Sequence, residues 1–425
     1  MELAMDGVRR SKEPKTHADA KGAEEDLPQA EKAASQVASP TEQASASPST
    51  AAAAPTYQVP RKRINSQRDL EIFTKSRLCE QLLSFAGELS QATRGIEISA
   101  SHLDSASPIV KALVEVLDEL ERWIDDFPPL QQPMRFGNKA FRQWHARLVE
   151  RAHPLMREAL RKARPSAEDA STEALALELS HYLRGSFGDE TRIDYGTGHE
   201  AAFFAVLFIL GAHDVLAKAD ARDAVLLVFA AYIRVMRRLQ TVYVQEPAGS
   251  HGAWGLDDFH ALPFLFGAAQ LIGKEDEVPT GTVYQESVVR EYADRFLYID
   301  AIRQVLQVKR GAPFHETSPM LYDITAVPTW QRIHSGLVRM YRAEVLGKHP
   351  VIQHFLFGET LRWPGGDDSS ATAAPPSATR AGTAGAAAGY AAAAMPPPLA
   401  PQKAPVVSSA VPGWVPCAAP WARPG

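Results

Sequence analysis

The sequence contains very little cysteine: Cys79 and Cys417 are the only two among 425 residues. Two cysteines support neither a disulfide framework nor a cysteine-based zinc site. Such scarcity is typical of proteins that work in a reducing compartment. The low cysteine content therefore favours an intracellular protein.

Long apolar runs are missing as well. The N-terminus has no apolar stretch like that of a secretory signal peptide. The longest apolar stretches, 201–212 and 224–235, are too short or too interrupted to span a bilayer. We therefore expect a cytoplasmic protein with no membrane partner. The basic run Arg61-Lys62-Arg63 leaves an additional nuclear location open, although three residues make a short import signal.

A large excess of charge of one sign is also absent. The formal net charge is only −5, which gives no argument for nucleic acid as a partner. Hydrophobic residues make up 45% of the chain, enough for a large core or for one core with sub-domains.

Several familiar catalytic motifs are not found. There is no Walker-type Gly-x-x-x-x-Gly-Lys-[Ser/Thr], no His-Glu-x-x-His and no Gly-x-Ser-x-Gly. The spacing of His199, His251 and His354 matches no metal-binding pattern. Each of these histidines alone is more typical of a packed or hydrogen-bonded residue than of a ligand.

What the middle of the chain does contain is helical periodicity, so the predicted class is all-α. Apolar residues recur at helical spacing, and neither strand alternation of any length nor an internal repeat is found. The stretch from Thr197 is apolar all round and should be the most buried helix. Helices are expected over 70–89, 108–124, 136–162, 171–182, 197–216, 220–243, 256–272 with a bend at Pro263, 287–309 and 329–346.

The two ends of the chain differ in composition from the middle. Residues 1–56 are rich in Ala, Ser, Pro, Glu and Lys, and 365–425 form an Ala/Pro-rich tract. Neither end can bury enough apolar surface to offset the entropy of ordering. We predict a disordered tail over 1–56, an all-α domain over 57–364, and a second disordered tail over 365–425.

A possible anion site lies in 191–200. Thr197-Gly198-His199-Glu200 has the form of a capping box, and a strongly apolar run follows it. Small residues there leave backbone amides uncovered at a helix start, and Arg192 could add a forked donor. These features suit a phosphate, but a well-capped core helix whose Arg192 pairs with Asp194 would give the same pattern.

A glycine-rich stretch, 246–259, is the other candidate site. Loops that are costly to order are more often binding surfaces than connectors. On a helix the neighbours Asp257 and Asp258 would diverge by roughly 100°. One should cap the following helix while the other faces a cleft, where one carboxylate suffices for Mg²⁺ beside phosphate oxygens. Alternatively, both serve only the helix start.

Four stretches resemble the phosphotyrosyl phosphatase activator family, which activates protein phosphatase type 2A and includes the Rrd/Ypa peptidyl-prolyl isomerases. They occur in the family's order and together span about residues 57–364. They are Gln-Pro-Met-Arg-Phe-Gly-Asn-Lys-Ala-Phe-Arg from Gln132, Arg-Ile-Asp-Tyr-Gly-Thr-Gly-His-Glu-Ala-Ala-Phe from Arg192, Glu-Pro-Ala-Gly-Ser-His-Gly-Ala-Trp-Gly-Leu-Asp-Asp-Phe from Glu246, and Pro-Val-Ile-Gln-His-Phe from Pro350.

The resemblance implies a helical core bundle with lid and linker sub-domains, and ATP and Mg²⁺ as cofactors. By matching positions, the metal would be held at Gly252 and Asp258. The residues implied to bind ATP are Arg192, Thr197, Gly198, Gln353, His354 and Phe355. One departure is Gly188-Asp189, where many members have Gly-Asn, and the added carboxylate is expected to weaken nucleotide binding.

The resemblance further implies an activator that binds the catalytic subunit of protein phosphatase type 2A with ATP and Mg²⁺ and remodels its active site. A stand-alone prolyl isomerase is the alternative, since isomerisation needs a pocket for an X-Pro segment and no nucleophile. A helical scaffold without activity is the third possibility. Candidates for contact with a proline-containing peptide or with the phosphatase are Trp254, Leu256, Asp257 and Phe259.

Overall fold

The computed structural model describes residues 58–131, 136–249 and 255–366. Contacts between Cα atoms divide the chain into a unit of residues 1–55 and a unit of residues 56–425, and every described residue belongs to the second. The predictions of disorder for 1–56 and 365–425 thus fall almost wholly outside the described residues. None of the described helices is both long and apolar enough to cross a lipid bilayer.

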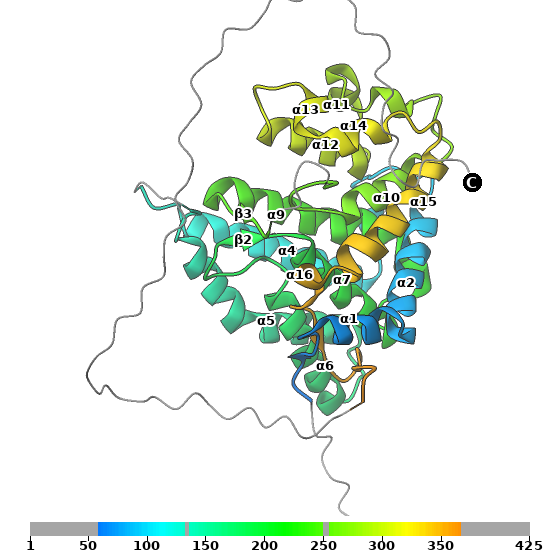
Figure 1. Cartoon of the computed structure of the whole chain (residues 1–425). Coiled ribbons are helices and arrows are strands. Elements are labelled where there is room, and N and C mark those ends of the chain that lie inside the picture. The colour runs from blue at the N-terminus through cyan, green and yellow to red at the C-terminus, as the bar shows by residue number, and fades with distance from the viewer. Residues whose placement is uncertain (1–57, 132–135, 250–254, 367–425) are drawn as a thin grey trace, which may run out of the picture. The chain divides into compact units, whose positions relative to one another are not determined.

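Helices dominate this part of the chain, which confirms the predicted all-α class (Figure 1). The α-helices are α1 (Gln67–Thr74), α2 (Arg77–Thr93), α3 (His102–Ser105), α4 (Pro108–Asp126), α5 (Phe141–Ala163), α6 (Asp169–Arg184), α7 (Thr197–Ala212), α8 (Ala221–Asp223), α9 (Ala230–Tyr243), α10 (Leu262–Leu271), α11 (Glu286–Tyr292), α12 (Leu297–Val308), α13 (Phe314–Thr317), α14 (Pro319–Ile324), α15 (Trp330–Met340) and α16 (His349–Ile352). Short 3₁₀ turns lie at η1 (Lys218–Asp220) and η3 (Thr280–Thr282), and π-helical turns at η2 (Ala224–Phe229) and η4 (Tyr341–Leu346).

The most buried helix is α10 rather than α7. All ten residues of α10 are buried. Helix α7 has six residues that are not fully buried, and those at its start face a cavity described below. The prediction that the stretch from Thr197 is the most buried was therefore wrong, because a functional surface takes part of that helix.

Several predicted helices are shorter or divided in the structure. The stretch 70–89 belongs to two helices, since the hydroxyl of Ser76 accepts the amide of Cys79 and starts α2 anew. The stretch 287–309 is divided into α11 and α12. The helix expected from Phe136 begins only at Phe141. The polar cap at Ser76 sets the first of these boundaries, whereas α5, α11 and α12 begin without a cap from a described side chain, and periodicity registers neither kind of start.

Helix α10 was expected to begin at Leu256 and to bend at Pro263, and this was wrong. It begins at Leu262, so Pro263 occupies the first turn. Proline costs little there, because its missing N–H would have no partner within the helix. Residues 255–261 are instead bends and irregular backbone.

Two short strand pairs join segments that are far apart in the sequence. Strands β1 (Arg61–Lys62) and β4 (Leu356–Phe357) are antiparallel, and β2 (Asp194–Tyr195) and β3 (Glu246–Pro247) are parallel. The second pair brings together the two motif stretches that begin at Arg192 and Glu246. The first pair closes the two ends of the described chain onto each other.

Helices α11 to α14 lie together on one side of the folded part of the molecule, next to α10 (Figure 1). The backbones of α10 and α12 come very close at Gly267, where a Cβ atom would lie 2.0 Å from the amide nitrogen of Tyr298. Only glycine permits this approach. This smaller helical group beside the core is consistent with the sub-domains that the family resemblance implies.

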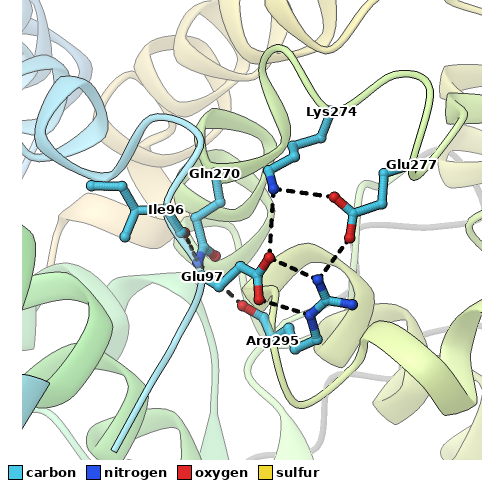
Figure 2. Close-up of polar contacts among 6 residues, drawn as sticks. All are labelled: Ile96, Glu97, Gln270, Lys274, Glu277 and Arg295. Carbon is cyan, nitrogen blue, oxygen red and sulfur yellow. Dashed lines mark hydrogen bonds and ion pairs between the residues drawn. The ribbon is translucent and has the colours of Figure 1, made fainter. Parts of the chain in front are cut away.

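A cluster of charged residues fastens this junction (Figure 2). Arg295 donates two hydrogen bonds to the Glu97 carboxylate, at 2.8 and 2.7 Å, and one to Glu277 at 2.7 Å. Lys274 lies 3.1 Å from Glu277 and 3.5 Å from Glu97. Beside them, the Gln270 amide donates to the carbonyl of Ile96 at 2.9 Å. These bonds hold the loop after α2, the loop after α10 and the start of α12 in one arrangement.

Candidate functional site

The loop before α7 has a tight, strained backbone. Gly188 has φ +112°, and a Cβ atom there would lie 2.5 Å from the carbonyl oxygen of Asp194. Ile193 has φ +55°, which is unusual for a β-branched residue. Backbone strain of this kind concentrates at functional sites. The loop is held closed because Asp189 and Asp194 pair as an isolated antiparallel bridge.

Within this loop, Arg192 lies between two carboxylates. Its Nε donates to Asp194 Oδ2 at 2.6 Å, and its Nη1 lies 3.4 Å from Asp189 Oδ2. The bond to Asp194 raises the pKa of Arg192, with burial opposing it. The sequence left open whether Arg192 binds a phosphate or pairs with Asp194, and the structure contains the pair with Asp194. Half of the Arg192 side chain remains exposed, so the guanidinium still has surface to offer a ligand.

Asp189, the departure from the family pattern, has two functions. Its carboxylate holds the backbone turn that follows it, and it places a negative charge beside Arg192. Its Oδ1 accepts the amides of Thr191 and Arg192, both at 2.9 Å. Burial raises the pKa of the Asp189 carboxyl, but these backbone bonds and the charge of Arg192 outweigh burial and lower it. The turn requires only the first function, which an asparagine oxygen would also perform.

The predicted capping box at Thr197 is not formed. Gly196 is the N-cap of α7, and no side chain within the described ranges caps this helix. The hydroxyl of Thr197 is buried and has no hydrogen-bond partner among the described residues. The Glu200 carboxylate does not reach back, because it binds backbone amides at the start of α10. The helix start therefore keeps uncovered amides together with an unused hydroxyl, a combination suited to an anion.

His199, on the first turn of α7, is held as a neutral imidazole. Its Nδ1–H donates to the carbonyl of Gly185 at 2.8 Å, and its ring stacks on Tyr195. Burial lowers the pKa of His199, although the bond to Gly185 opposes this shift. The geometry leaves Nε2 as an acceptor.

The segment after α16 closes the site from the other end of the chain. Lys62 donates to Nδ1 of His354 at 3.3 Å, and burial lowers the pKa of His354, with Lys62 adding to the shift. Phe355 is buried against Phe73 and Tyr182. A Cβ atom at Gly198 would lie 2.8 Å from the carbonyl of Val351 in α16, so α16 itself packs directly on the first turn of α7.

Together these segments line a cavity of about 460 Å³, which we call the first cavity. Of the residues implied to bind ATP, Gln353 does not line it, and its amide donates to the carbonyl of Pro350. Sequence reasoning missed Lys62 and Lys348, whose positions in the sequence gave no sign of this role. The implied residues that do line the cavity are Arg192, Thr197, Gly198, His354 and Phe355.

A second cavity of about 520 Å³ lies next to the first, and Thr197 lines both. Two of the predicted contact residues, Leu256 and Asp257, line this second cavity. Trp254 and Gly252 lie outside the described residues. The second cavity is mainly apolar, with lining residues that include Leu256, Met320, Leu337, Met340 and Val345.

Asp257 and Asp258 have different partners, but the prediction that one of them caps the following helix was wrong, because both precede α10 in an irregular segment and no side chain of that segment caps α10. Asp257 Oδ2 accepts the amides of Phe259 and His260 at 3.1 and 2.9 Å, so it caps the turn before α10. Asp258 lies 2.9 Å from the ammonium of Lys309. Asp258 and Phe259 line a separate, very small cavity beside α12 and neither of the larger ones. The described structure thus does not bring Asp258 to the first cavity.

A buried polar network separates the two large cavities. His260 Nδ1 lies 3.1 Å from Glu200 Oε1 and 3.4 Å from the hydroxyl of Tyr195. The Tyr195 hydroxyl is 2.8 Å from that of Tyr232, which donates to the carbonyl of Ser186. Burial raises the pKa of both tyrosines well above the usual value.

The first cavity has features that suit an anion, and the carboxylates of Asp189, Glu190 and Asp194 line it as well. It combines the open start of α7, the unused Thr197 hydroxyl and the cationic groups of Lys62, Arg192 and Lys348. Among the residues that the structure describes, no cluster of three or more His, Cys, Asp or Glu side chains could hold a metal ion. A metal site at Asp258 and Gly252 stays a prediction.

The fold and the site define an all-α protein with an anion-type cavity at the start of a central helix. A family model described as phosphotyrosyl phosphate activator (PTPA) protein matches residues 60–363. The chain therefore belongs to the phosphotyrosyl phosphatase activator family. All four motif stretches noted in the sequence lie within the matched residues.

Relatives agree with this assignment. The chain is 38% identical over 302 residues to "Probable serine/threonine-protein phosphatase 2A activator 1" of Dictyostelium discoideum, covering 71% of this chain and 90% of the relative. It is 40% identical over 300 residues to "Serine/threonine-protein phosphatase 2A activator" of Drosophila melanogaster, covering 71% and 72%. The crystal structure of "the PP2A phosphatase activator Ypa1 PTPA1" is similar with a TM-score of 0.62 at 35% identity, covering 72% of this chain and 96% of that one.

Proposed function

We propose that this protein activates the catalytic subunit of protein phosphatase type 2A, and that it binds ATP with Mg²⁺ in the first cavity when it does so. The names of its relatives support the activator role. The observation that carries the nucleotide part is the uncapped start of α7, where the Thr197 hydroxyl is buried and finds no partner among the residues that the structure describes, beside Arg192 and Lys348.

In this proposal the chain's own residues bind the nucleotide and orient it. The amides at the start of α7 and the Thr197 hydroxyl would donate to phosphate oxygens, and Arg192 and Lys348 would balance their charge. Bound ATP with Mg²⁺ supplies phosphoryl chemistry at the surface shared with the phosphatase. His354 and Phe355, which line the same cavity, would contact the remainder of the nucleotide.

We further propose that the second cavity accepts an X-Pro segment and gives the protein peptidyl-prolyl isomerase activity. An apolar cavity that excludes water favours the twisted amide, in which the C–N bond has lost its partial double-bond character. Its lining by Leu256, Met320 and Met340 supplies such surroundings, and Asp257 and His260 offer polar groups at its wall. A proline-containing segment of the phosphatase is the expected natural substrate.

The activator role is tested by binding and activation assays with the purified phosphatase catalytic subunit, with and without ATP and Mg²⁺. Wild-type protein should bind the subunit and raise its activity only with both cofactors present. Arg192→Gln should weaken ATP binding. Arg222→Gln is the matched control, because Arg222 forms a similar pair with Asp223 that does not line the first cavity. Equal ATP affinity in both variants would overturn the nucleotide assignment.

The isomerase part is tested with a proline peptide in the absence of phosphatase. Leu256→Gln should lower the isomerisation rate, whereas Leu83→Gln, at another partly buried position that does not line the second cavity, should not. Activity that survives loss of phosphatase binding would favour a stand-alone isomerase. If the protein binds the phosphatase but neither activates it nor isomerises peptides, the helical scaffold is the correct description.

A further inference from the structure

We infer that Glu200 is a positioning residue that couples the two large cavities, so that occupation of the first changes the affinity of the second. This inference rests on the proposed function, which places ATP in the first cavity and an X-Pro segment in the second.

The first observation is where Glu200 lies. It is completely buried on the first turn of α7. The residues just before it, Thr197, Gly198 and His199, all line the first cavity. A ligand that orders this turn therefore also fixes the backbone that carries Glu200.

The second observation is what the Glu200 carboxylate binds. Oε2 accepts the amides of Ala261 and Leu262 at 2.9 and 3.0 Å, and Oε1 lies 3.1 Å from Nδ1 of His260. His260 and Ala261 both line the second cavity. Glu200 thus stands on the helical turn that lines the first cavity and binds two residues that line the second.

The third observation is that α10 has no cap of its own. Its N-cap residue is Ala261, which has no polar side chain, and no local side chain caps the helix. Helix starts normally find such a partner close by in the sequence. Here the first amides of α10 depend on a carboxylate from α7, so the position of one helix start sets that of the other.

A second connection runs parallel to the first. Tyr195, in β2 directly before α7, lies with its hydroxyl 3.4 Å from Nδ1 of His260. Nε2 of His260 lies 3.3 Å from the Gln240 amide nitrogen, which can donate to it. With Nε2 as acceptor, Nδ1–H donates to Glu200, and both ring nitrogens of His260 have partners. The wall of the second cavity is therefore held from the α7 side through His260 and Ala261.

Coupling between two binding sites is reciprocal and is typically about 5-fold or more. The affinity of wild-type protein for a proline peptide should be measured by calorimetry without ATP and with saturating ATP and Mg²⁺. The two values should differ at least about fivefold, and the peptide should change the ATP affinity by the same factor. If both ligands bind but do not affect each other, this inference is wrong while the proposed function stands. If neither ligand binds alone, both are wrong.

Variants test whether the coupling runs through Glu200. Glu200→Ala should reduce the coupling factor to about one, whereas Glu200→Gln should retain most of it, because the amide oxygen can still accept the amides of Ala261 and Leu262. Glu178→Ala is the matched control: Glu178 is also buried and also accepts a backbone amide, that of Thr360, but it lines neither cavity. A coupling factor that falls equally in both alanine variants would overturn the inference.

A measurement on wild-type protein decides the question even if Glu200→Ala does not fold. Addition of ATP and Mg²⁺ should slow hydrogen exchange at the amides of Ala261 and Leu262, which bind Glu200. The amide of Thr360, bound by Glu178, should exchange at an unchanged rate. Unchanged exchange at Ala261 and Leu262 in protein that has bound ATP would contradict the inference.

Discussion

Arg192 and Asp194 form a hydrogen-bonded ion pair beside the first cavity, with 2.6 Å between Nε and Oδ2. The pair orients the guanidinium but also neutralises part of its charge, and Asp189 adds a second carboxylate at 3.4 Å. The anion site that we propose therefore contains its own competing anions. Its affinity depends on how readily a phosphate displaces them.

The first prediction follows from Asp189. Asp189→Asn should tighten ATP binding about fivefold, because a negative charge beside the phosphates is removed. The turn should persist, since an asparagine oxygen can still accept the amides of Thr191 and Arg192. Calorimetric titration with ATP measures the change. Glu190→Gln is the control, because Glu190 also lines the cavity but its carboxylate lies beside His145, 3.6 Å from Nδ1. Equal gains in both variants would indicate a general charge effect rather than release of Arg192.

The second prediction concerns the Thr197 hydroxyl. Thr197→Ala should change the free energy of unfolding by less than about 0.5 kcal/mol, since no cap is lost, whereas a lost helix cap typically costs about 1 kcal/mol. ATP affinity should fall about tenfold, because a hydrogen bond to a charged phosphate is removed. Thr197→Ser should behave like wild type. Thermal melting and ATP titration of the three proteins provide the test, and a destabilised alanine variant with normal ATP binding would show that the hydroxyl is only structural.

The third prediction tests the close contact between the first turn of α7 and Val351 in α16. Gly198→Ala should destabilise the protein and weaken ATP binding, because the new methyl group would lie 2.8 Å from the carbonyl of Val351. Gly211→Ala, on the same helix, meets nothing closer than 3.5 Å. The second change should be neutral or stabilising by about 1 kcal/mol or less, since alanine has the higher helix propensity. Comparable melting temperatures for both variants would rule out a tight contact at Gly198.

The fourth prediction addresses magnesium. If Asp258 is the metal ligand, Asp258→Asn should raise the Mg²⁺ concentration needed for phosphatase activation at saturating ATP, because the ion prefers anionic oxygen. Loss of the partly exposed pair with Lys309 should cost no more than about 1 kcal/mol. Asp257→Asn should keep a normal Mg²⁺ requirement, since asparagine can still accept the amides that Asp257 binds. Identical Mg²⁺ curves for all three proteins would remove Asp258 from the site.

The fifth prediction concerns pH. Burial lowers the pKa of His199 in the folded protein, whereas the unfolded chain binds that proton near the ordinary value of about 6.5. As pH falls through this value, the unfolded state takes up more protons, so the free energy of unfolding should decrease. His199→Gln should make the decrease shallower. Some slope should remain, because burial also lowers the pKa of His145, His181, His334 and His354. Urea denaturation at several pH values between 8 and 5 measures both slopes, and identical slopes would contradict the assignment.

The sequence was sufficient to predict the class of fold and five of the residues that line the first cavity. Helical periodicity depends on spacing within one segment, so it could be read without tertiary information. The four motif stretches led to Arg192, Thr197, Gly198, His354 and Phe355, which the structure brings together around one cavity. Lys62 lies nearly 300 residues from His354 in the chain, so only the pairing of β1 with β4 reveals their contact.

Only the tertiary structure decided which partner each polar group takes. The pattern Thr-x-x-Glu predicts a local capping box, yet Glu200 binds α10 and leaves the Thr197 hydroxyl free of partners among the described residues. In the same way, the adjacent carboxylates have different partners. Asp257 accepts a backbone amide of the following turn, and Asp258 pairs with Lys309. A buried carboxylate binds the unpaired donors that packing brings nearest, wherever they stand in the sequence, because leaving those donors unpaired costs more than giving up a local cap.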